Sequence, residues 1–406
     1  MTDTARVTAT LAEPVAAVRD LRNDYRQESY DHIPGTVVRG ALAAARIRHY
    51  GPPKQDDATF LEIFEGDGTF GPLHSHNSLP VPLSVKVHKY RPGATCTQLW
   101  WDTATGVNAD TCPKCGQKLE FSKGDPTGQV QRSQRTHVAL DEEGVAVDGS
   151  LYRQNSIAAG NVFAGWLSGP AVRALTIDGA PVDTLIFGGK QSVQGRAEIA
   201  VDFTAEPEPV KVDGDTVILY LAAPGVFVDA FGLPSDEPDL CELSGVLGVK
   251  ALKVTRKRVR WTTVGGWHQA SGLPKSTERA VRAGSVYQIR CAEAPAEDAR
   301  RVLMVRGVGL RRREGFGALY LPQEPFTRHR WKGLLAPMRG DWKTFQTQLP
   351  LLRARVAELR DGIRDDAPYQ ERLEADDRYA TALRELLSIT EPRLVSDLLD
   401  DLEAGK

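Results

Sequence analysis

The stretch "DHIPGTVVRGALAAARIRHY" (residues 31–50) decides the first part of the fold, because a turn signal leads directly into a helical pattern. Pro34-Gly35 predicts a turn, and Thr36 is an acceptable N-cap residue. The apolar positions that recur at helical spacing are Val37, Ala41, Leu42 and Ala45. The sequence therefore predicts a helix over residues 36–49.

The start of this helix has a second possible role. Free N–H groups at a helix start bind anions, and Arg39 beside Gly40 would add a planar, permanently charged donor. His32 and His49 flank the helix. A packed first helix with a surface arginine and a phosphate-docking edge are both compatible with these residues.

Strand patterns surround the helix on both sides. Residues 5–18 predict an opening strand, 135–155 a hairpin, and 184–203 two strands around the turn "FGGKQSVQGR" (187–196). The second half repeats the pattern at 216–231, 250–264, 283–290 and 301–321, the last read as strands around a glycine-rich basic tip. Two such halves, meeting near "EPEPVKVDGD" (206–215), favour the duplication of one α+β unit.

The chain ends in an acidic helical tail. Apolar residues recur at helical spacing in three segments from about residue 339, separated by Pro368 and Pro392: Leu352, Val356, Leu359 and Ile363; Tyr379, Leu383 and Leu386; Leu394, Leu398 and Leu402. The acidic exterior of this tail argues against nucleic acid and favours contact with protein.

Composition indicates a globular cytoplasmic protein. The 406 residues are 41% hydrophobic and 26% charged, and no apolar run approaches the roughly 20 residues of a membrane helix. The start "MTDTARVTAT" does not have the layout of a secretory signal. Five cysteines, two of them in a Cys-x-x-Cys pair, suit a reducing compartment.

Charge is distributed unevenly along the chain. Residues 250–313 hold 16 Lys/Arg and 4 Asp/Glu, a net +12, while the whole chain carries −2, so the remainder carries −14. Glycines and aromatic residues lie between these cations. Cations for phosphates and rings for bases favour a nucleic-acid groove over a merely solvated face.

Trp267, which follows Gly266 in this stretch, has two possible roles. It is either a stacking platform for a base or a plug in the core of its own domain. The sequence alone leaves both open.

The segment "TCPKCGQKLEF" (111–121) predicts a metal site. Cys112 and Cys115 place two thiolates at ligand spacing, and Cys96 is the obvious third ligand. His88, His76 and His74 are the candidates for the fourth, with His88 preferred. These flanks do not resemble those of a redox Cys-x-x-Cys pair, so we expect structural zinc. Cys241 and Cys291 are expected in apolar core strands.

Catalytic signatures are sparse. No G-x-S-x-G, H-E-x-x-H or phosphate-loop motif is present. The histidines that could act as general acid or base on RNA are His32, His49, His137 and His268. No partner group is placed beside them by sequence.

Four segments together resemble a known family. "YDHIPGTVVRGALA" (30–43) resembles the opening helix motif of the CRISPR-associated RAMP superfamily. "DGSLYRQNSIAAGNVFAGWL" (148–167) and "FGGKQSVQGRAE" (187–198) resemble its middle hairpin and glycine-rich loop. "VGGWHQASGLPKSTERAVRAGSVY" (264–287) resembles the subunit that caps the 5′ end of CRISPR RNA in type III effector complexes, and the inserted cysteines resemble the III-D branch.

The resemblance implies an α+β fold of three parts. Residues 1–205 would form a ferredoxin-like (RRM-type) domain with a zinc-binding insertion at about 70–135. Residues 206–335 would form a second, degraded copy, and 336–406 the helical segment.

The resemblance also implies a function in antiviral defence. The chain would be a non-catalytic subunit that binds the repeat-derived 5′ tag of CRISPR RNA and contacts the large subunit and the backbone subunits, reaching target nucleic acid only indirectly. The alternative is a RAMP endoribonuclease that processes precursor CRISPR RNA. The residues implied to face RNA are Arg39, Gly40, Gly188, Gly189, Lys190, Gly266, Trp267, Lys275, Arg279, Arg282 and Ser285.

Overall fold

The structure is a computed structural model. It describes residues 3–17, 26–75, 78–90, 100–106, 108–126, 130–138, 141–145, 152–188, 194–268, 271–322 and 346–360, with Leu383, Leu387, Val395 and Leu399. The chain divides into two compact units. The first holds residues 1–86, 101–108 and 121–323, and the second holds 87–100, 109–120 and 324–406.

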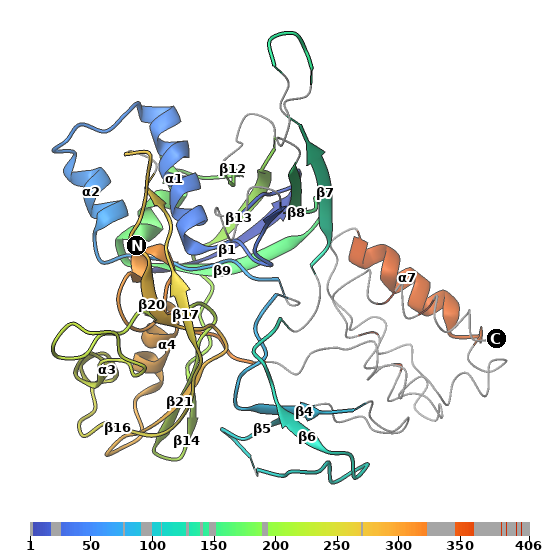
Figure 1. The fold of residues 1–406 in the computed structure, drawn as a ribbon, viewed down its shortest axis with the longest axis vertical. Helices are drawn as coiled ribbons and strands as arrows, with labels where there is room; N and C mark the ends of the chain where they lie inside the picture. The colour runs from blue at the N-terminus through green and yellow to red at the C-terminus, as the bar shows by residue number, and fades with distance from the viewer. Residues whose placement is uncertain are drawn as a thin grey trace. The chain divides into compact units, whose positions relative to one another are not determined.

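The first sheet of the larger unit has five antiparallel strands (Figure 1). Their order is β12 (Thr184–Ile186), β13 (Arg196–Asp202), β1 (Thr4–Leu11), β9 (Val162–Ser168) and β3 (Thr69–Phe70). Alternate residues of β1 are buried: Ala5, Val7, Ala9 and Leu11. They share one core with helix α1 (Gly35–Tyr50), whose buried residues include Val38, Ala41, Leu42 and Ala45.

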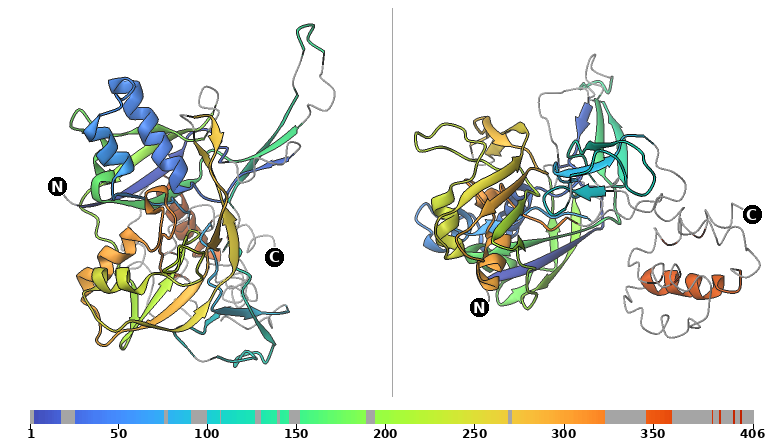
Figure 2. Two further views of the ribbon diagram at one scale, coloured as in Figure 1. Left: turned by 60° about the vertical axis from the view of Figure 1, so that its left-hand side comes forward. Right: turned by 90° about the horizontal axis from the view of Figure 1, so that it is seen from below.

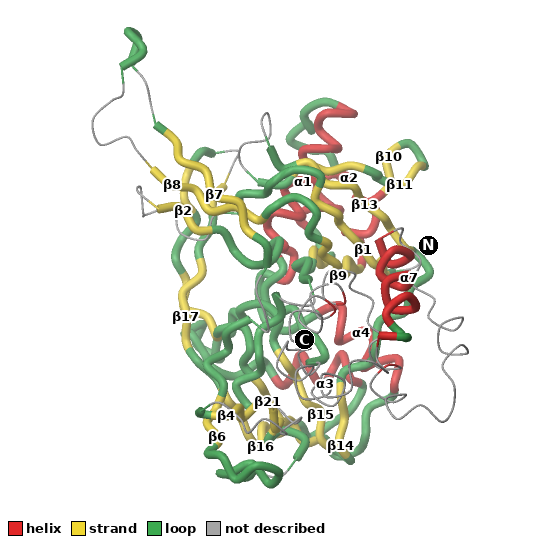
Figure 3. Tube along the Cα trace, turned by 90° about the vertical axis from the view of Figure 1, so that its right-hand side faces the viewer, coloured by secondary structure: helices red, strands yellow, loops and turns green. Residues whose placement is uncertain are grey.

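The second sheet repeats this path. Its order is β14 (Lys211–Asp213), β15 (Thr216–Tyr220), β21 (Val286–Arg290) and β16 (Lys253–Arg258), again antiparallel (Figure 3). Val217, Leu219, Tyr287 and Ile289 pack with residues of α3 (Leu240–Leu247) and α4 (Glu297–Arg306).

The two sheets share one connectivity. In the first, the chain runs β1, α1, β3, β9, the 3₁₀ helix η1 (Gly169–Leu175) and β13, and β9 lies between β1 and β3. In the second it runs β15, α3, β16, β21 and α4, and β21 lies between β15 and β16. This is the split βαβ arrangement. The fourth strand of the second copy is degenerate, because β14 occupies its place and only Leu319, after α4, bridges to Leu221. The α+β class is confirmed.

Shorter strands form smaller sheets. One joins β2 (Arg26–Glu28), β8 (Tyr152–Ile157) and β7 (Arg132–His137), and its β7–β8 hairpin is prominent in Figure 2. Another joins β5 (Trp100–Asp102), β4 (Val85–His88) and β6 (Leu119–Phe121). The two-stranded ribbons are β10 (Thr176–Ile177) with β11 (Ala180–Pro181), β17 (Trp261–Val264) with β20 (Glu278–Val281), and β18 (Trp267–His268) with β19 (Leu273–Pro274). The remaining helices are α2 (Ala58–Glu65), η2 (Arg312–Glu314) and α7 (Leu349–Arg360).

The base of the insertion covers the second face of the second sheet. Ala104 packs with Ile218, Tyr220 and Val286. The Tyr220 hydroxyl donates to the Asp102 carboxylate at 2.6 Å, and burial, followed by Asp102, raises the pKa of Tyr220. Both faces of this sheet are therefore occupied by the protein itself.

The predicted hairpin and the first helix are present. β7 pairs with β8 from Arg132–Ile157 to His137–Tyr152, and Gly144 between them has φ +79°. Helix α1 begins one residue earlier than predicted. Its N-cap is Pro34 rather than Thr36: the Pro34 carbonyl accepts from Val37 and Val38 N–H. There is no side-chain cap bond, because the proline ring has no acceptor atom.

The reading of residues 301–321 as strands is wrong. Helix α4 runs to Arg306, and a loop with the short η2 follows. The start signals of this helix, Glu297 and Asp298, lie upstream of the quoted stretch, and Gly307 ends it at φ +71°. Cys291 is buried as predicted, whereas Cys241 is exposed on α3 rather than in a core strand.

The second unit contains part of the predicted tail. In α7, Leu352, Val356 and Leu359 are buried, as is Leu383 further along. Buried Leu387, Val395 and Leu399 each lie one residue after a predicted position. The other predicted tail positions lie outside the described residues. No helix in the described ranges is long and apolar enough to cross a membrane.

Candidate nucleic-acid interface and metal centre

Ion pairs divide the cations of residues 250–313 into two groups. Carboxylates of the protein pair with Lys257, Lys275, Arg282, Arg290, Arg301, Arg306, Arg311, Arg312 and Arg313. The described residues give no ion pair to Lys250, Lys253, Arg256, Arg258, Arg260, Arg279 or Arg300. All of these except Arg300 are exposed, and all except Arg300 lie on or beside β16, β17 and β20. The excess positive charge is therefore concentrated on these strands.

The β17–β20 ribbon exposes an aromatic ring against a guanidinium group. Thr263 pairs directly with Arg279, which makes Trp261 the diagonal neighbour of Arg279 on the same face. The Arg279 Cζ lies 4.1 Å from the centre of the Trp261 ring, and Trp261 is 38% exposed. Val264 and Ala280, on the other face, pack against Val226. The ribbon thus has a core side and a cationic, aromatic solvent side.

Two guanidinium groups converge on one backbone carbonyl at the end of this ribbon. Arg260 and Arg282 each donate to the carbonyl oxygen of Lys123, both at 3.2 Å. Lys123 is itself exposed, and the counter-charge is Asp125, 3.4 Å from Arg282 and 69% exposed. Like charges held this close attract an anion.

A second arginine–aromatic stack lies nearby in the sequence. The Arg258 Cζ is 3.9 Å from the centre of the Phe121 ring. We call Phe121, Lys123, Arg258, Arg260, Trp261, Arg279 and Arg282 the basic ribbon.

Of the residues implied to face RNA by the resemblance, two belong to the basic ribbon, Arg279 and Arg282. Trp267 is 47% exposed, so it is no core plug. Lys275 donates to Glu314 at 2.7 Å, and its backbone N–H bonds the carbonyl of Gly266. Ser285 is fully buried, and its hydroxyl accepts from the N–H of Arg260. Ser285 therefore supports the backbone of the basic ribbon from inside.

The first helix is tied to other parts of the protein. Arg39 donates to the carbonyl of Phe64 at 2.9 Å and pairs with the carboxylate of Glu65. A Cβ on Gly35 would lie 2.1 Å from the Phe70 carbonyl oxygen and 2.6 Å from the Gly315 Cα. The protein's own backbone thus covers the entrance of the helix. Gly40 is exposed, with open space around it.

The glycine-rich turn is described only in part. Gly188 has φ +90°, and a Cβ there would lie 2.7 Å from the Ala16 carbonyl oxygen, so a side chain is excluded. Gly189 and Lys190 lie outside the described residues.

Each described histidine near the first helix has a neighbour that the sequence did not place. The His32 and His74 rings stack at 4.4 Å. Burial, and next His32, hold the pKa of His74 well below its usual range. His49 Nε2 lies 2.6 Å from Asp178, in the Asp178-Gly179 turn of the β10–β11 hairpin. Tyr50 donates to the same carboxylate at 2.8 Å.

The other two candidate histidines lie on short strands. His137 ends β7 and stacks on Tyr152 with ring centres 4.9 Å apart. His268 lies in β18 and pairs in register with Leu273.

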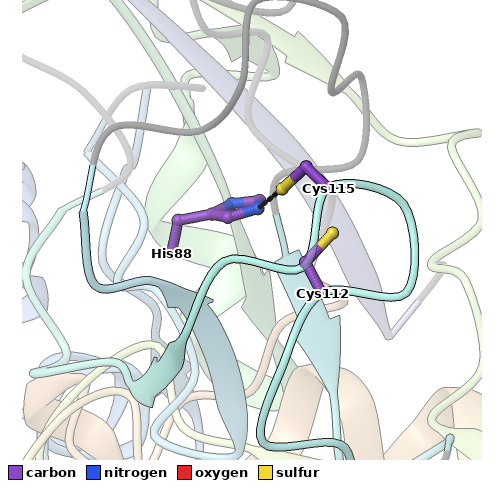
Figure 4. A group of neighbouring side chains, drawn as sticks. All are labelled: His88, Cys112 and Cys115. Atoms are coloured by element: carbon purple, nitrogen blue, oxygen red, sulfur yellow. Dashed lines mark hydrogen bonds between the residues drawn. The ribbon is translucent and has the colours of Figure 1, made fainter.

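Three of the four predicted metal ligands come together in the second unit (Figure 4). One ligand atom each from His88, Cys112 and Cys115 lies within 4.8 Å of the others, and His88 Nε2 is 3.2 Å from Cys115 Sγ. The Lys114 N–H donates to Cys112 Sγ at 3.4 Å, as amides do around metal-bound thiolates. Gly116, at φ +69°, lets the chain turn back. Two thiolates and an imidazole suit zinc, with ligand bonds of about 2.0–2.3 Å. Cys96 and His76 lie outside the described residues.

Several solved structures are similar to this chain. One is titled a cryo-EM structure of the type III-B Cmr-beta complex bound to cognate target RNA (12% identity, 70% of this chain and 86% of that chain covered, TM-score 0.38). Another is a Cas6-related protein from Pyrococcus furiosus (10% identity, 79% and 99% covered, TM-score 0.35). A third is titled a RAMP protein binding different RNA substrates (12% identity, 79% and 99% covered, TM-score 0.32). No curated protein matches the chain.

The sequence itself matches a family model. Residues 125–323, just under half of the chain, match the family described as CRISPR-associated protein (Cas_Cmr3). This segment contains β7 to η2, including both strands of the Trp261–Arg279 ribbon. The matched range contains three of the four segments that resemble the RAMP superfamily (148–167, 187–198 and 264–287), and over this range the chain is similar to a family of CRISPR-associated proteins.

Proposed function

We propose that this chain is a non-catalytic RNA-binding subunit of a type III effector complex and that the basic ribbon binds the repeat-derived 5′ tag of CRISPR RNA. The observation that carries this proposal is the exposed Trp261–Arg279 stack among arginines without carboxylate partners. Bases of single-stranded RNA stack on such rings, and free guanidinium groups bind its phosphates.

The arrangement of the basic ribbon fits a flexible strand better than a duplex. Two arginine–aromatic stacks supply flat surfaces, and Arg260 and Arg282, which both donate to the Lys123 carbonyl, supply positive charge. Duplex RNA is recognised chiefly through its phosphates and 2′-hydroxyls and offers few base faces for stacking. The phosphates of the tag would displace Asp125 from Arg282.

Protein subunits of the same complex are the other partners we propose, in the cytoplasm. The large subunit and the backbone subunits would contact this chain, and target nucleic acid would be reached only through the complex. The three parts at 1–205, 206–335 and 336–406 stay our description of its organisation, with each of the first two built on a ferredoxin-like unit. The shared split βαβ order of the two sheets supports that duplication.

The metal centre is proposed as structural zinc held by His88, Cys112, Cys115 and Cys96. Zinc bound there would fix the end of β4, at His88, to the turn before β6. A site closed by four protein ligands leaves no position for a catalytic water.

RNA binding by the full chain tests the function. Fluorescence anisotropy would compare a labelled single-stranded RNA of the repeat-derived tag with a scrambled RNA and a DNA of equal length. We expect the tag RNA to bind most tightly and Arg279→Ala to weaken it. Equal, weak binding of all three probes would remove the tag assignment, and no RNA binding would remove the function.

A further inference from the structure

The loop between β15 and α3 presents two large apolar side chains to solvent. Phe231 is 88% exposed, the highest value for a large apolar residue in the described ranges, and Leu233 is 61% exposed. Val228, at the base of the same loop, is 38% exposed. Single exposed apolar residues need no explanation, but three within six positions form a patch.

This loop is held in one conformation. The Asp229 Oδ1 accepts from the N–H groups of Phe231 and Leu233, both at 2.9 Å. The N–H of Asp229 donates to the Leu233 carbonyl at 2.8 Å, and Gly232 N–H donates to the Asp229 carbonyl at 3.0 Å. Gly232 has φ +78°, a backbone conformation that residues with a side chain rarely adopt. Because the turn is already fixed, binding a partner through its tip would cost little backbone conformational entropy.

The root of the loop lies in the core. Phe227 is buried and meets the Tyr287 ring at 6.1 Å in a T-shaped arrangement. A Cβ on Gly309 would lie 2.6 Å from the Phe227 ring, so a glycine there makes room for it. Phe227 faces the core, whereas Phe231, four residues later, faces solvent. The loop is therefore anchored at its base while its tip is exposed.

Charge indicates the kind of partner. Residues 229–249 contain Asp229, Asp236, Glu237, Asp239 and Glu242 and no Lys, Arg or His. Lys257 pairs with Asp236 at 2.8 Å and Glu237 at 2.6 Å, and Glu242 pairs with Arg306 and Arg312. The described residues give no ion pair to Asp229 or Asp239, so this loop keeps a negative charge at Asp229. Phosphates would be repelled here, in contrast to the basic ribbon.

We propose that Phe231 and Leu233 form a docking knob that inserts into an apolar pocket, rimmed by Lys or Arg, on a neighbouring protein subunit. Buried aromatic anchors surrounded by polar rims dominate protein interfaces, and complementary charge steers the encounter. The inference rests on the proposed function, because that function places protein subunits beside this chain.

The test uses the complex. The chain, carrying an affinity tag, is co-expressed with the other protein subunits of its own type III complex, and each co-purified subunit is quantified. We expect the double variant Phe231→Ser/Leu233→Ser to lose one subunit at least tenfold, with unchanged melting temperature and unchanged anisotropy on the tag RNA. Leu61→Ser, on the 44% exposed Leu61 of α2, is the matched control and should retain every subunit.

A charge variant separates geometry from electrostatics. Asp229→Asn keeps an oxygen that can accept the two N–H bonds of the turn but removes the negative charge. At low salt, Asp229→Asn should recover less of the co-purified subunit than the wild type does. This difference in recovery should shrink as the salt concentration rises.

Three results would overturn the proposal. Full recovery of every subunit by the double variant would show that the knob is not an anchor. A loss of RNA affinity in the double variant would assign the patch to RNA. A wild-type chain that sediments as a dimer, with the double variant a monomer, would make the partner a second copy. Failure of the proposed function is distinguishable, because it removes RNA binding by the wild type and leaves knob-dependent recovery unaffected.

Discussion

The guanidinium group of Arg279 covers the face of Trp261, with its central carbon 4.1 Å from the ring centre, although the two residues are separated by 17 positions that include the β18–β19 turn. The antiparallel register of β17 and β20 creates this contact. The pair forms a flat, positively charged surface at the solvent side of the basic ribbon.

Removing the ring should weaken RNA binding without unfolding the protein. Trp261→Ala should cost about 1–3 kcal/mol of binding, the usual worth of one base stacked on an aromatic side chain. Its melting temperature should stay close to that of the wild type, because the ring is 38% exposed. Anisotropy titrations and thermal melts measure the two effects. Trp267→Ala, measured beside it, reports whether the more exposed tryptophan also stacks; a normal affinity in Trp261→Ala would move the base platform elsewhere.

The cluster at Lys123 should contribute to the salt dependence of binding. Arg260→Gln and Arg282→Gln should each lower the slope of log K against log salt by about 0.7, the value for one contact with a single-stranded phosphate. The measurement is a series of titrations between low and moderate salt. Arg301→Gln is the control, since Arg301 is already paired with Glu206 and Glu297. Slopes that stay at the wild-type value would place the phosphates away from this cluster.

The metal centre should retain its ion during purification. Elemental analysis after dialysis against a chelator should give about one zinc per chain, as expected of a closed four-ligand site. Cys112→Ser and Cys115→Ser should lose the metal, whereas Cys241→Ser should keep it, because Cys241 lies exposed on α3. A metal-free wild-type chain with every thiol open to titration would contradict the zinc assignment.

His74 should make the protein less stable in mild acid. Its pKa is lowered in the folded state by burial and by His32, so the unfolded chain binds a proton below pH about 6.5 that the folded chain does not. The contribution of neutral His74 to the free energy of unfolding is therefore complete above pH about 6.5 and is lost as the pH falls below that value. Denaturant unfolding between pH 8 and pH 5 should show a smaller fall for His74→Gln than for the wild type. An identical fall in both proteins would exclude His74 as the responsible group.

The chain alone should not cleave RNA. The structure pairs His49 with Asp178 at 2.6 Å and stacks His32 on His74. Because a histidine held by a carboxylate is also the arrangement of a general base, these two pairs are the ones that a cleavage assay must test. Labelled repeat RNA incubated with pure protein and a chelator should stay intact on a denaturing gel. Cleavage that disappears in His32→Ala or His49→Ala would favour the processing ribonuclease.

Local patterns predicted the parts of the fold that depend on neighbouring residues. The first helix and the β7–β8 hairpin follow from apolar spacing and turn residues that lie within the elements themselves. Residues 301–321 were wrongly predicted as strands because the glycines after Arg306 resemble a hairpin turn. The acidic residues that mark the start of α4 lie before this stretch. A window that began at Glu297 would have contained the helix signal.

The candidate site was predictable only in part. The excess of cations is visible in the sequence, but which of them stay free depends on carboxylates far away along the chain. Glu242 pairs with both Arg306 and Arg312 across more than 60 residues, and no short pattern reveals this. Trp261 was missed in favour of Trp267 because the register of β17 and β20, rather than adjacent glycines, brings Arg279 onto its ring.

The contact between Gly35 and Gly315 has a consequence for synthesis of the protein. The strands of the first sheet have all left the ribosome once Asp202 has emerged, but Gly315, which closes the entrance of α1, is translated 113 residues later (315 − 202). At usual elongation rates this interval lasts on the order of ten seconds. During it the nascent first half exposes a gap at its helix that only the second half can fill. A fragment cut near residue 205 would keep that gap permanently.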